Sequence, residues 1–248
     1  MTNRHIFADI DQLSQHVAQT IVTLANEAKQ HGRPFNIALA GGSTPKYLYS
    51  YLASPLLAEK IAWGGVNIYF GDERAVPPSH ADSNYGLAKK YLLDQLPIPS
   101  ENIHRMYGEV SDLHQAAAAY NQLLEEQLPH TATGVPQFDL ILLGLGGDGH
   151  VASLFPGSPV LTEREKWVAA AYIPALTAWR ISLTLPILNH SKRLFLLVAG
   201  AAKAAIIAEV LEHPQPHARY PVELLQPQGE LHWFLDQAVA HRLEPPTP

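Results

Sequence analysis

The stretch DLILLGLGGDGHVASLFPGSP, residues 139–159, joins a strand signal to a polar, flexible turn. Its first part is apolar throughout, which is typical of a strand covered on both faces in a parallel sheet. Four glycines then follow within the six residues 144–149, and they are interrupted by Asp148 and followed by His150. Because glycine leaves the backbone open, this turn can expose the acid and the histidine at the end of a buried strand. The stretch therefore predicts an α/β fold and a site at this turn.

On either side of this stretch, apolar runs alternate with segments in which apolar residues recur at helical spacing. Strands are predicted at 35–40, 66–70, 138–145, 167–173, 180–185 and 193–199, with short late strands at 222–225 and 231–234. Helices are predicted over 10–28, 45–52, 83–93, 113–128 and 201–211, with Ser43 or Thr44 as the cap of the second. Such alternation predicts one doubly wound α/β domain over residues 1–248: a single, mainly parallel sheet flanked by helices in a Rossmann-like three-layer arrangement.

Composition excludes several classes of protein. The 248 residues are 47% hydrophobic and carry a net charge of -6, which argues against a nucleic-acid or anionic-membrane partner. The chain contains no cysteine, so disulfides and thiolate zinc sites are excluded. Asp9 and Asp11 interrupt the N-terminal segment where a signal peptide would be apolar. No stretch approaches the roughly 20 apolar residues of a membrane span. We expect a soluble, cytoplasmic protein.

Four polar or glycine-rich turns each follow a predicted strand directly. They are residues 41–45, 71–74, 144–150 and 200–203. In a parallel sheet the carboxyl ends of the strands meet at one edge, and ligands of doubly wound proteins bind there. We therefore expect the four turns to open onto one site.

Two of these turns suit a phosphate group. Gly41, Gly42 and Ser43 lead into a predicted helix, whose free N–H groups and positive end favour an anion. Lys203 lies in the first turn of another predicted helix, where its own charge is disfavoured unless an anion compensates it. The alternatives are an ordinary capped glycine turn and a solvated lysine.

A third turn places Asp72, Glu73 and Arg74 directly behind a buried strand. Three charges in a row are often a solvated turn. At the ligand edge of the sheet they favour binding of a polyhydroxylated ligand instead.

Residues 144–149 also match the dinucleotide pattern G-x-G-x-x-G. That motif requires a long following helix and then a strand that ends in an acid for the ribose. Here Pro156 and Pro159 interrupt the helix, and the strand predicted at 167–173 ends without an acid. We therefore attribute the match to glycine richness and predict no nicotinamide cofactor.

His150 is the candidate catalytic residue of the turn. Asp148, two residues before it, can fix its tautomer and raise its basicity, as a general base requires. A serine nucleophile is not supported, because G-x-S-x-G is absent. H-E-x-x-H and other helical metal pairs are absent too, so we predict no catalytic metal and no cofactor.

With these turns in view, the sequence resembles the 6-phosphogluconolactonase family, which is related to glucosamine-6-phosphate deaminase. Five segments carry the resemblance, in the family's order: LAGGSTPKYLY (39–49), FGDERAVPPSHADSNYG (70–86), LLGLGGDGHVASLFPGSP (142–159), RISLTLPILN (180–189) and LVAGAAKA (197–204). They spread over residues 36–205, so the resemblance covers most of the chain.

The resemblance implies hydrolysis of 6-phospho-D-glucono-1,5-lactone to 6-phospho-D-gluconate, the second step of the oxidative pentose phosphate pathway. In that reaction His150 would activate water, and Asp148 would orient it or contact the sugar. The implied substrate-binding residues are Gly41, Gly42, Ser43 and Lys203 around the phosphate, Arg74 and Arg180 as further anion contacts, and Asp72 at the sugar hydroxyls. Only the family pattern suggests Arg180.

Two departures separate this chain from the deaminases that share the Asp-Gly-His turn. The deaminase pattern continues F-N-E-P, with its glutamate in the catalytic relay, whereas this chain has Phe155 in that position. The deaminases also have an aromatic residue where this chain has Arg74. A deaminase or sugar-phosphate isomerase, which needs a second proton-transfer carboxylate, and a non-catalytic sugar-phosphate-binding regulator remain the alternatives.

Overall fold

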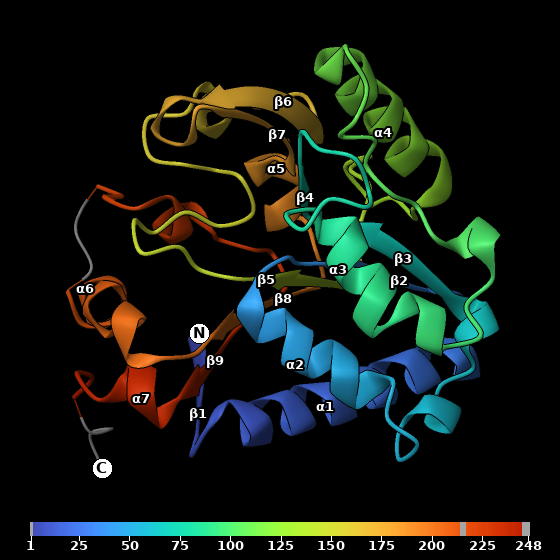
Figure 1. The fold of residues 1–248 in the computed structure, drawn as a ribbon, viewed down its shortest axis with the longest axis horizontal. Coiled ribbons are helices and arrows are strands. Elements are labelled where there is room, and N and C mark those ends of the chain that lie inside the picture. The colour runs from blue at the N-terminus through green and yellow to red at the C-terminus, as the bar shows by residue number, and fades with distance from the viewer. Residues whose placement is uncertain (1, 214–216, 245–248) are drawn as a thin grey trace.

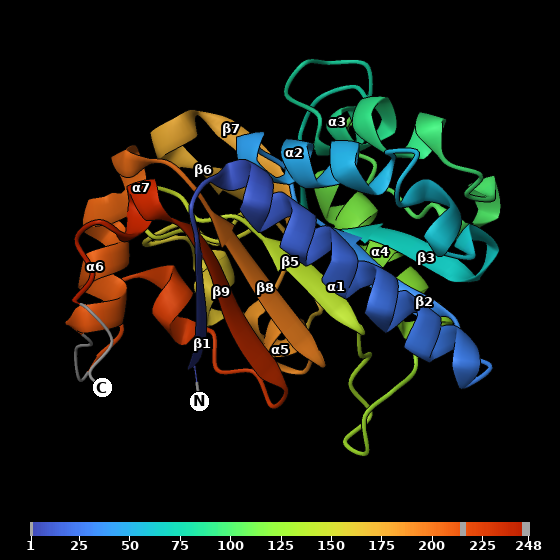
Figure 2. The ribbon, with the colours of Figure 1, turned by 90° about the horizontal axis from the view of Figure 1, so that it is seen from below.

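A six-stranded parallel sheet forms the centre of the protein (Figures 1 and 2). The computed structural model describes residues 2–213 and 217–244. The sheet has the order β1-β9-β8-β5-β2-β3, and every pairing in it is parallel. Its strands are β1 (Thr2–Phe7), β2 (Phe35–Leu39), β3 (Val66–Phe70), β5 (Leu140–Leu143), β8 (Arg193–Val198) and β9 (Glu230–Asp236).

Helices cover both faces of this sheet because its strands are apolar on both sides. Along β8, Phe195 and Leu197 join one buried cluster, while Leu194, Leu196 and Val198 join the other. One cluster packs under α1 (Ile10–Gln30), α2 (Ser43–Leu52) and α3 (Asn84–Tyr91). The other packs under α4 (Leu113–Gln127), α5 (Leu185–Asn189), α6 (Ala204–Glu212) and α7 (Gln237–Ala240). The predicted three-layer α/β class is confirmed, and α1 lies along one face in Figure 2. No helix in residues 2–213 or 217–244 is both long and apolar enough to cross a membrane.

A second, three-stranded antiparallel sheet corrects the expectation of one sheet. It has the order β4-β7-β6 and consists of β4 (Asp72–Arg74), β7 (Ala178–Leu183) and β6 (Val168–Ile173). The sequence predicts strands close to β6 and β7, but not their separate sheet. It treats 72–74 as a turn only, because three charged residues carry no strand signal. Their pairing with residues 180–182 of β7 makes them a short strand.

One further prediction is wrong, and one strand of the structure is not predicted. The strand predicted at 222–225 is instead a short 3₁₀ helix, Pro221–Leu224, because Pro221 fixes φ at its first position and Glu223 caps it. The strand β1 is not predicted at all. Its residues Asn3, Arg4 and His5 are polar and give no strand signal in the sequence. The strand forms by pairing with β9.

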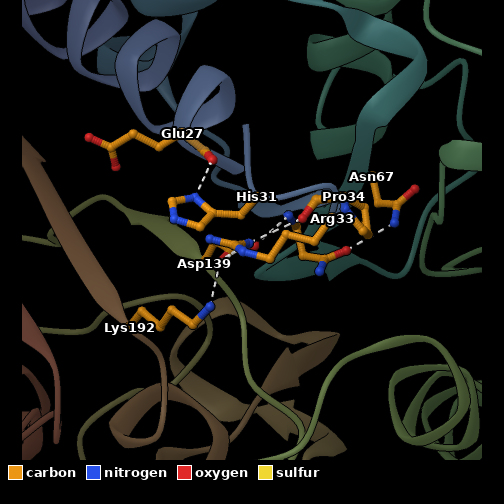
Figure 3. Close-up of polar contacts among 8 residues, drawn as sticks. Glu27, His31, Arg33, Pro34, Asn67, Asp139 and Lys192 are labelled. Carbon is orange, nitrogen blue, oxygen red and sulfur yellow. Dashed lines mark hydrogen bonds and ion pairs between the residues drawn. The ribbon is translucent and has the colours of Figure 1, made fainter. Parts of the chain in front are cut away.

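The amino-terminal edge of the parallel sheet is held by a buried carboxylate, Asp139 (Figure 3). Its Oδ1 accepts hydrogen bonds from Arg33 Nη1 at 2.7 Å and Lys192 Nζ at 2.8 Å. Its Oδ2 accepts the backbone N–H of Asn36 at 3.0 Å, and the Asn36 side chain bonds to Asn67. These contacts tie together the amino ends of β2, β3, β5 and β8, so this edge is closed by polar contacts and the opposite edge carries the turns.

Candidate functional site

The four turns predicted to share one edge do meet there. Each follows a strand of the parallel sheet, namely β2, β3, β5 and β8, and together they surround a pocket of about 220 Å³. The polar and glycine residues that line the pocket are Gly41, Gly42, Ser43, Thr44, Gly71, Asp72, Arg74, Gly144, Gly146, His150 and Lys203. The position of the site follows from the parallel topology.

The first wall of the pocket is the turn between β2 and α2. Gly42 has φ +99° and is the N-cap of α2, in place of the predicted Ser43 or Thr44. A residue with a side chain rarely adopts this φ, whereas glycine adopts it freely. The cap makes no side-chain hydrogen bond, so the N–H groups of the first turn receive no cap there. Gly41 has a different constraint, since a Cβ there would lie 1.7 Å from Asn84 Oδ1.

The second wall is the turn after β8. Lys203 ends a 3₁₀ turn, Ala201–Lys203, and is the N-cap residue of α6. Asp236 at the end of β9 anchors this turn, because its carboxylate accepts the Gly200 N–H and also that of Val239. Burial lowers the pKa of the Lys203 ammonium. Within the described part of the chain Lys203 forms no salt bridge, so its charge is available to a ligand.

The third wall is β4. Asp72 is buried, and its two carboxylate oxygens accept hydrogen bonds from Asn84 Nδ2 at 3.0 Å and Ser153 Oγ at 2.6 Å. Arg74 lines the pocket and donates from Nη1 to the Asp82 carbonyl at 2.5 Å, while its Nε is buried without a partner among the described residues. Asp72 is therefore held in place from two other segments of the chain.

Glu73, between Asp72 and Arg74, does not line the pocket. Its carboxylate accepts the backbone N–H groups of Arg74, Asn84 and Tyr85 and the Ser83 hydroxyl. Burial raises the pKa of Glu73, and these backbone donors only partly oppose the rise. Glu73 thus holds the start of α3 against β4.

The fourth wall carries the acid–histidine pair. His150 Nδ1 lies 2.5 Å from Asp148 Oδ1, and the same oxygen accepts the His150 backbone N–H at 3.2 Å. Burial of Asp148 opposes its ionisation, but the hydrogen bond and charge of His150 outweigh it, so the pKa of Asp148 is lowered. An ionised Asp148 accepts a hydrogen bond from the Nδ1–H group, which leaves the lone pair of the neutral ring on Nε2. This arrangement can serve as a general base.

A glycine is required beside this pair. A Cβ on Gly146 would lie 2.1 Å from His150 Nδ1 and 2.6 Å from Asp148 Oδ1. The glycine at position 146 of the turn therefore has a steric cause.

Two residues predicted in the site do not line the pocket. Asp148 lies behind His150 and contacts it rather than the cavity. Arg180 lies in β7 directly opposite Arg74, and burial, followed by the Arg74 charge, lowers the pKa of Arg180. Within the described residues, neither arginine forms a salt bridge. The pair places two positive charges beside the pocket.

Sequence reasoning missed the residues that support the site, namely Asn84, Ser153 and Asp236. Their partners lie 12, 81 and 36 residues away in the chain. Asn84 and Ser153 do fall within the segments 70–86 and 142–159, but nothing in their local pattern marks them as contacts of Asp72.

The fold and this pocket define an α/β protein with a cation-lined site that contains a carboxylate-oriented histidine. The family model of glucosamine-6-phosphate isomerases/6-phosphogluconolactonase matches residues 8–233, and the chain belongs to this family. A 6-phosphogluconolactonase of Synechocystis is 40% identical over 209 residues, which cover 84% of this chain and 85% of that protein.

Two solved structures agree with this assignment. The devB protein has a TM-score of 0.91 and 36% identity, over 98% of this chain and 100% of that one. The 6-phosphogluconolactonase of Trypanosoma brucei has a TM-score of 0.86 and 30% identity, over 98% of this chain and 99% of that one.

Proposed function

We propose that this protein hydrolyses 6-phospho-D-glucono-1,5-lactone to 6-phospho-D-gluconate. The observation that carries the proposal is that His150, oriented by Asp148, lines the same pocket as the start of α2 and Lys203. The pocket thus offers a base and a phosphate-binding region within one cavity. The lactonases similar to this chain support the choice of substrate.

In the proposed reaction His150 Nε2 accepts a proton from a water molecule as its oxygen bonds to C1 of the lactone. Asp148 accepts the Nδ1 hydrogen bond and stabilises the imidazolium that forms. Collapse of the tetrahedral intermediate breaks the bond between C1 and the ring oxygen, and the imidazolium returns its proton to that oxygen. Such a base contributes about 10²–10⁴-fold to a rate.

The remaining pocket residues hold the substrate in this proposal. Gly41, Gly42, Ser43 and Lys203 contact the phosphate, with the N–H groups of α2 directed at it. Arg74 lines the pocket and contributes a further anion contact. Asp72 accepts hydrogen bonds from sugar hydroxyls, while Arg180 acts through its positive charge beside Arg74.

The test is a pH-stat assay with freshly made lactone, corrected for spontaneous hydrolysis. His150→Ala should fold normally and lose about 10²–10⁴-fold in kcat. Asp148→Asn should lose less, because it removes orientation and not the base. His31→Ala, at the opposite edge of the sheet and exposed, is the matched control and should keep wild-type turnover. Near-wild-type turnover of His150→Ala would contradict the mechanism.

The assay also separates the alternatives. Release of ammonia from glucosamine 6-phosphate would indicate a deaminase, although the residue stacked on the His150 ring is the buried Phe155 and not a second carboxylate. A rise in melting temperature with sugar phosphate but without turnover would indicate a binding protein.

A further inference from the structure

The face of the His150 imidazole is covered by the ring of Phe155. The two rings are stacked, with centroids 4.0 Å apart and an interplanar angle of 25°. Phe155 is 8% exposed and belongs to the buried apolar cluster under α4 to α7. One side of the proposed base is therefore in contact with the hydrophobic core.

The backbone between the two residues brings the rings together. Ala152 has φ +48°, a left-handed conformation that is uncommon for a residue with a side chain. It allows the chain to reverse, so that the Leu154 N–H donates to the Val151 carbonyl at 2.9 Å. The Phe155 carbonyl then accepts the Ser158 N–H at 3.0 Å. This tight turn places Phe155 over the ring five residues earlier in the chain.

We propose that Phe155 is a positioning residue that fixes the plane of the His150 ring and leaves Nε2 as its open atom. This inference rests on the proposed function. The hydrogen bond to Asp148 holds Nδ1 but does not by itself fix the plane of the ring. Stacking on Phe155 fixes that plane, and the contact with Gly146 leaves the ring little space on the Nδ1 side.

The chemistry of Phe155 also suits this position. A phenyl ring neither donates nor accepts a proton, and it keeps water from the face of the His150 ring that it covers. Within the described part of the chain, Nε2 makes no hydrogen bond. Water activated by His150 is thus restricted to the pocket side, where C1 of the lactone lies in the proposed reaction.

The variants Phe155→Leu and Phe155→Tyr test this inference. Leucine keeps an apolar side chain but removes the ring, and tyrosine keeps the ring. We expect Phe155→Leu to lower kcat by about 10- to 100-fold, since misplacement of a catalytic group by about 1 Å costs up to about 100-fold. Its KM should stay within about twofold, because the phosphate contacts are untouched. Phe155→Tyr should keep kcat near the wild-type value.

Phe138→Leu is the matched control. Phe138 is fully buried in the same cluster and packs edge-on against Tyr69. Its loss should lower the melting temperature as much as the loss of Phe155 does, while kcat stays unchanged. Equal losses of kcat in both leucine variants would reduce the role of Phe155 to core packing and overturn the proposal.

A readout without substrate separates this inference from the proposed function. In the nuclear magnetic resonance spectrum, the His150 ring protons, assigned by their absence from His150→Ala, should move downfield in Phe155→Leu because ring-current shielding is lost. They should not move in Phe138→Leu. Unmoved signals in Phe155→Leu would overturn the inference. Absence of lactonase turnover in the wild type would instead overturn the proposed function, and the shifts would still decide the placement of the ring.

Discussion

Within the described residues, the cations around the pocket, Lys203, Arg74 and Arg180, form no salt bridge with a carboxylate of the protein. Lys203 forms no salt bridge within the described residues, and burial lowers its pKa. Arg74 faces Arg180 across two paired strands, and the carboxylates of Asp72 and Glu73 accept hydrogen bonds from other donors. Placing charge in this way costs free energy in the unliganded protein. A phosphate of the substrate would offset that cost, so these residues favour a dianionic ligand.

This charge predicts how Lys203→Ala behaves. A charge-assisted contact contributes roughly 1.5–3 kcal/mol, and about 1.4 kcal/mol corresponds to tenfold. The variant should therefore lose 10- to 100-fold in kcat/KM with the phosphorylated lactone and almost nothing with glucono-δ-lactone. Steady-state kinetics with both substrates measures this difference. Lys60→Ala, at an exposed lysine away from the pocket, is the control. Equal losses on both substrates would show that Lys203 serves folding or chemistry and not phosphate binding.

The two edges of the parallel sheet differ: one forms the pocket, and polar contacts join the strands at the other. At the carboxyl edge, the turns after β2, β3, β5 and β8 are polar or rich in glycine, and they surround the pocket. At the amino edge, Asp139 joins the starts of three strands through Arg33, Asn36 and Lys192 (Figure 3). Stability at one edge is therefore separate from binding at the other.

Asp139→Asn tests this separation. The substitution removes a buried charge that two cations and a backbone N–H contact. We expect the free energy of unfolding to fall by about 3 kcal/mol, because each hydrogen bond to a charged group contributes roughly 1.5–3 kcal/mol and both cations are partly solvated. Urea unfolding measures the loss, and kcat below the unfolding temperature should not change. Asp94→Asn, which removes an exposed ion pair with Lys89, should leave the free energy of unfolding nearly unchanged, because solvent screens such pairs. A kcat loss in Asp139→Asn would show that the two edges are coupled.

At the scale of the whole molecule, the parallel sheet ends at β1, which packs through histidines. His5 Nε2 lies 3.0 Å from His232 Nδ1, and the His5 ring stacks on Phe234 with centroids 4.9 Å apart. The ring of His16 in α1 also stacks on the His5 ring, with centroids 6.2 Å apart. Burial, followed by the charges of His232 and His16, lowers the pKa of His5.

This lowered pKa predicts an acid-sensitive stability. The unfolded chain binds a proton at His5 near pH 6.5, while the folded protein binds it only at lower pH. The stability is thus fully present above about pH 6.5 and falls as the pH drops from there through the folded pKa. We expect urea unfolding midpoints to decrease from pH 7.5 to pH 5.5, and to decrease less in His5→Gln, which carries no charge. An identical decrease in the wild type and His5→Gln would contradict a contribution from His5.

The sequence by itself determined the strands and turns whose signals are local. An apolar run such as 140–143 predicts a strand, because a strand that is covered on both faces of a sheet is apolar on both. The glycines at 41, 42 and 146 mark turns because the local backbone or a close neighbour excludes a side chain. Parallel order then places the turns at one edge, so most of the pocket follows from sequence.

Only the tertiary structure decided the features that depend on partners distant in the chain. The charged segment 72–74 becomes a strand because β7 pairs with it, and Asp72 is held by Asn84 and Ser153. Arg180 lies beside the pocket and not in its lining. Such contacts leave no periodic pattern in the sequence, because they are fixed by the packing of separate segments and not by the conformational preference of any one of them.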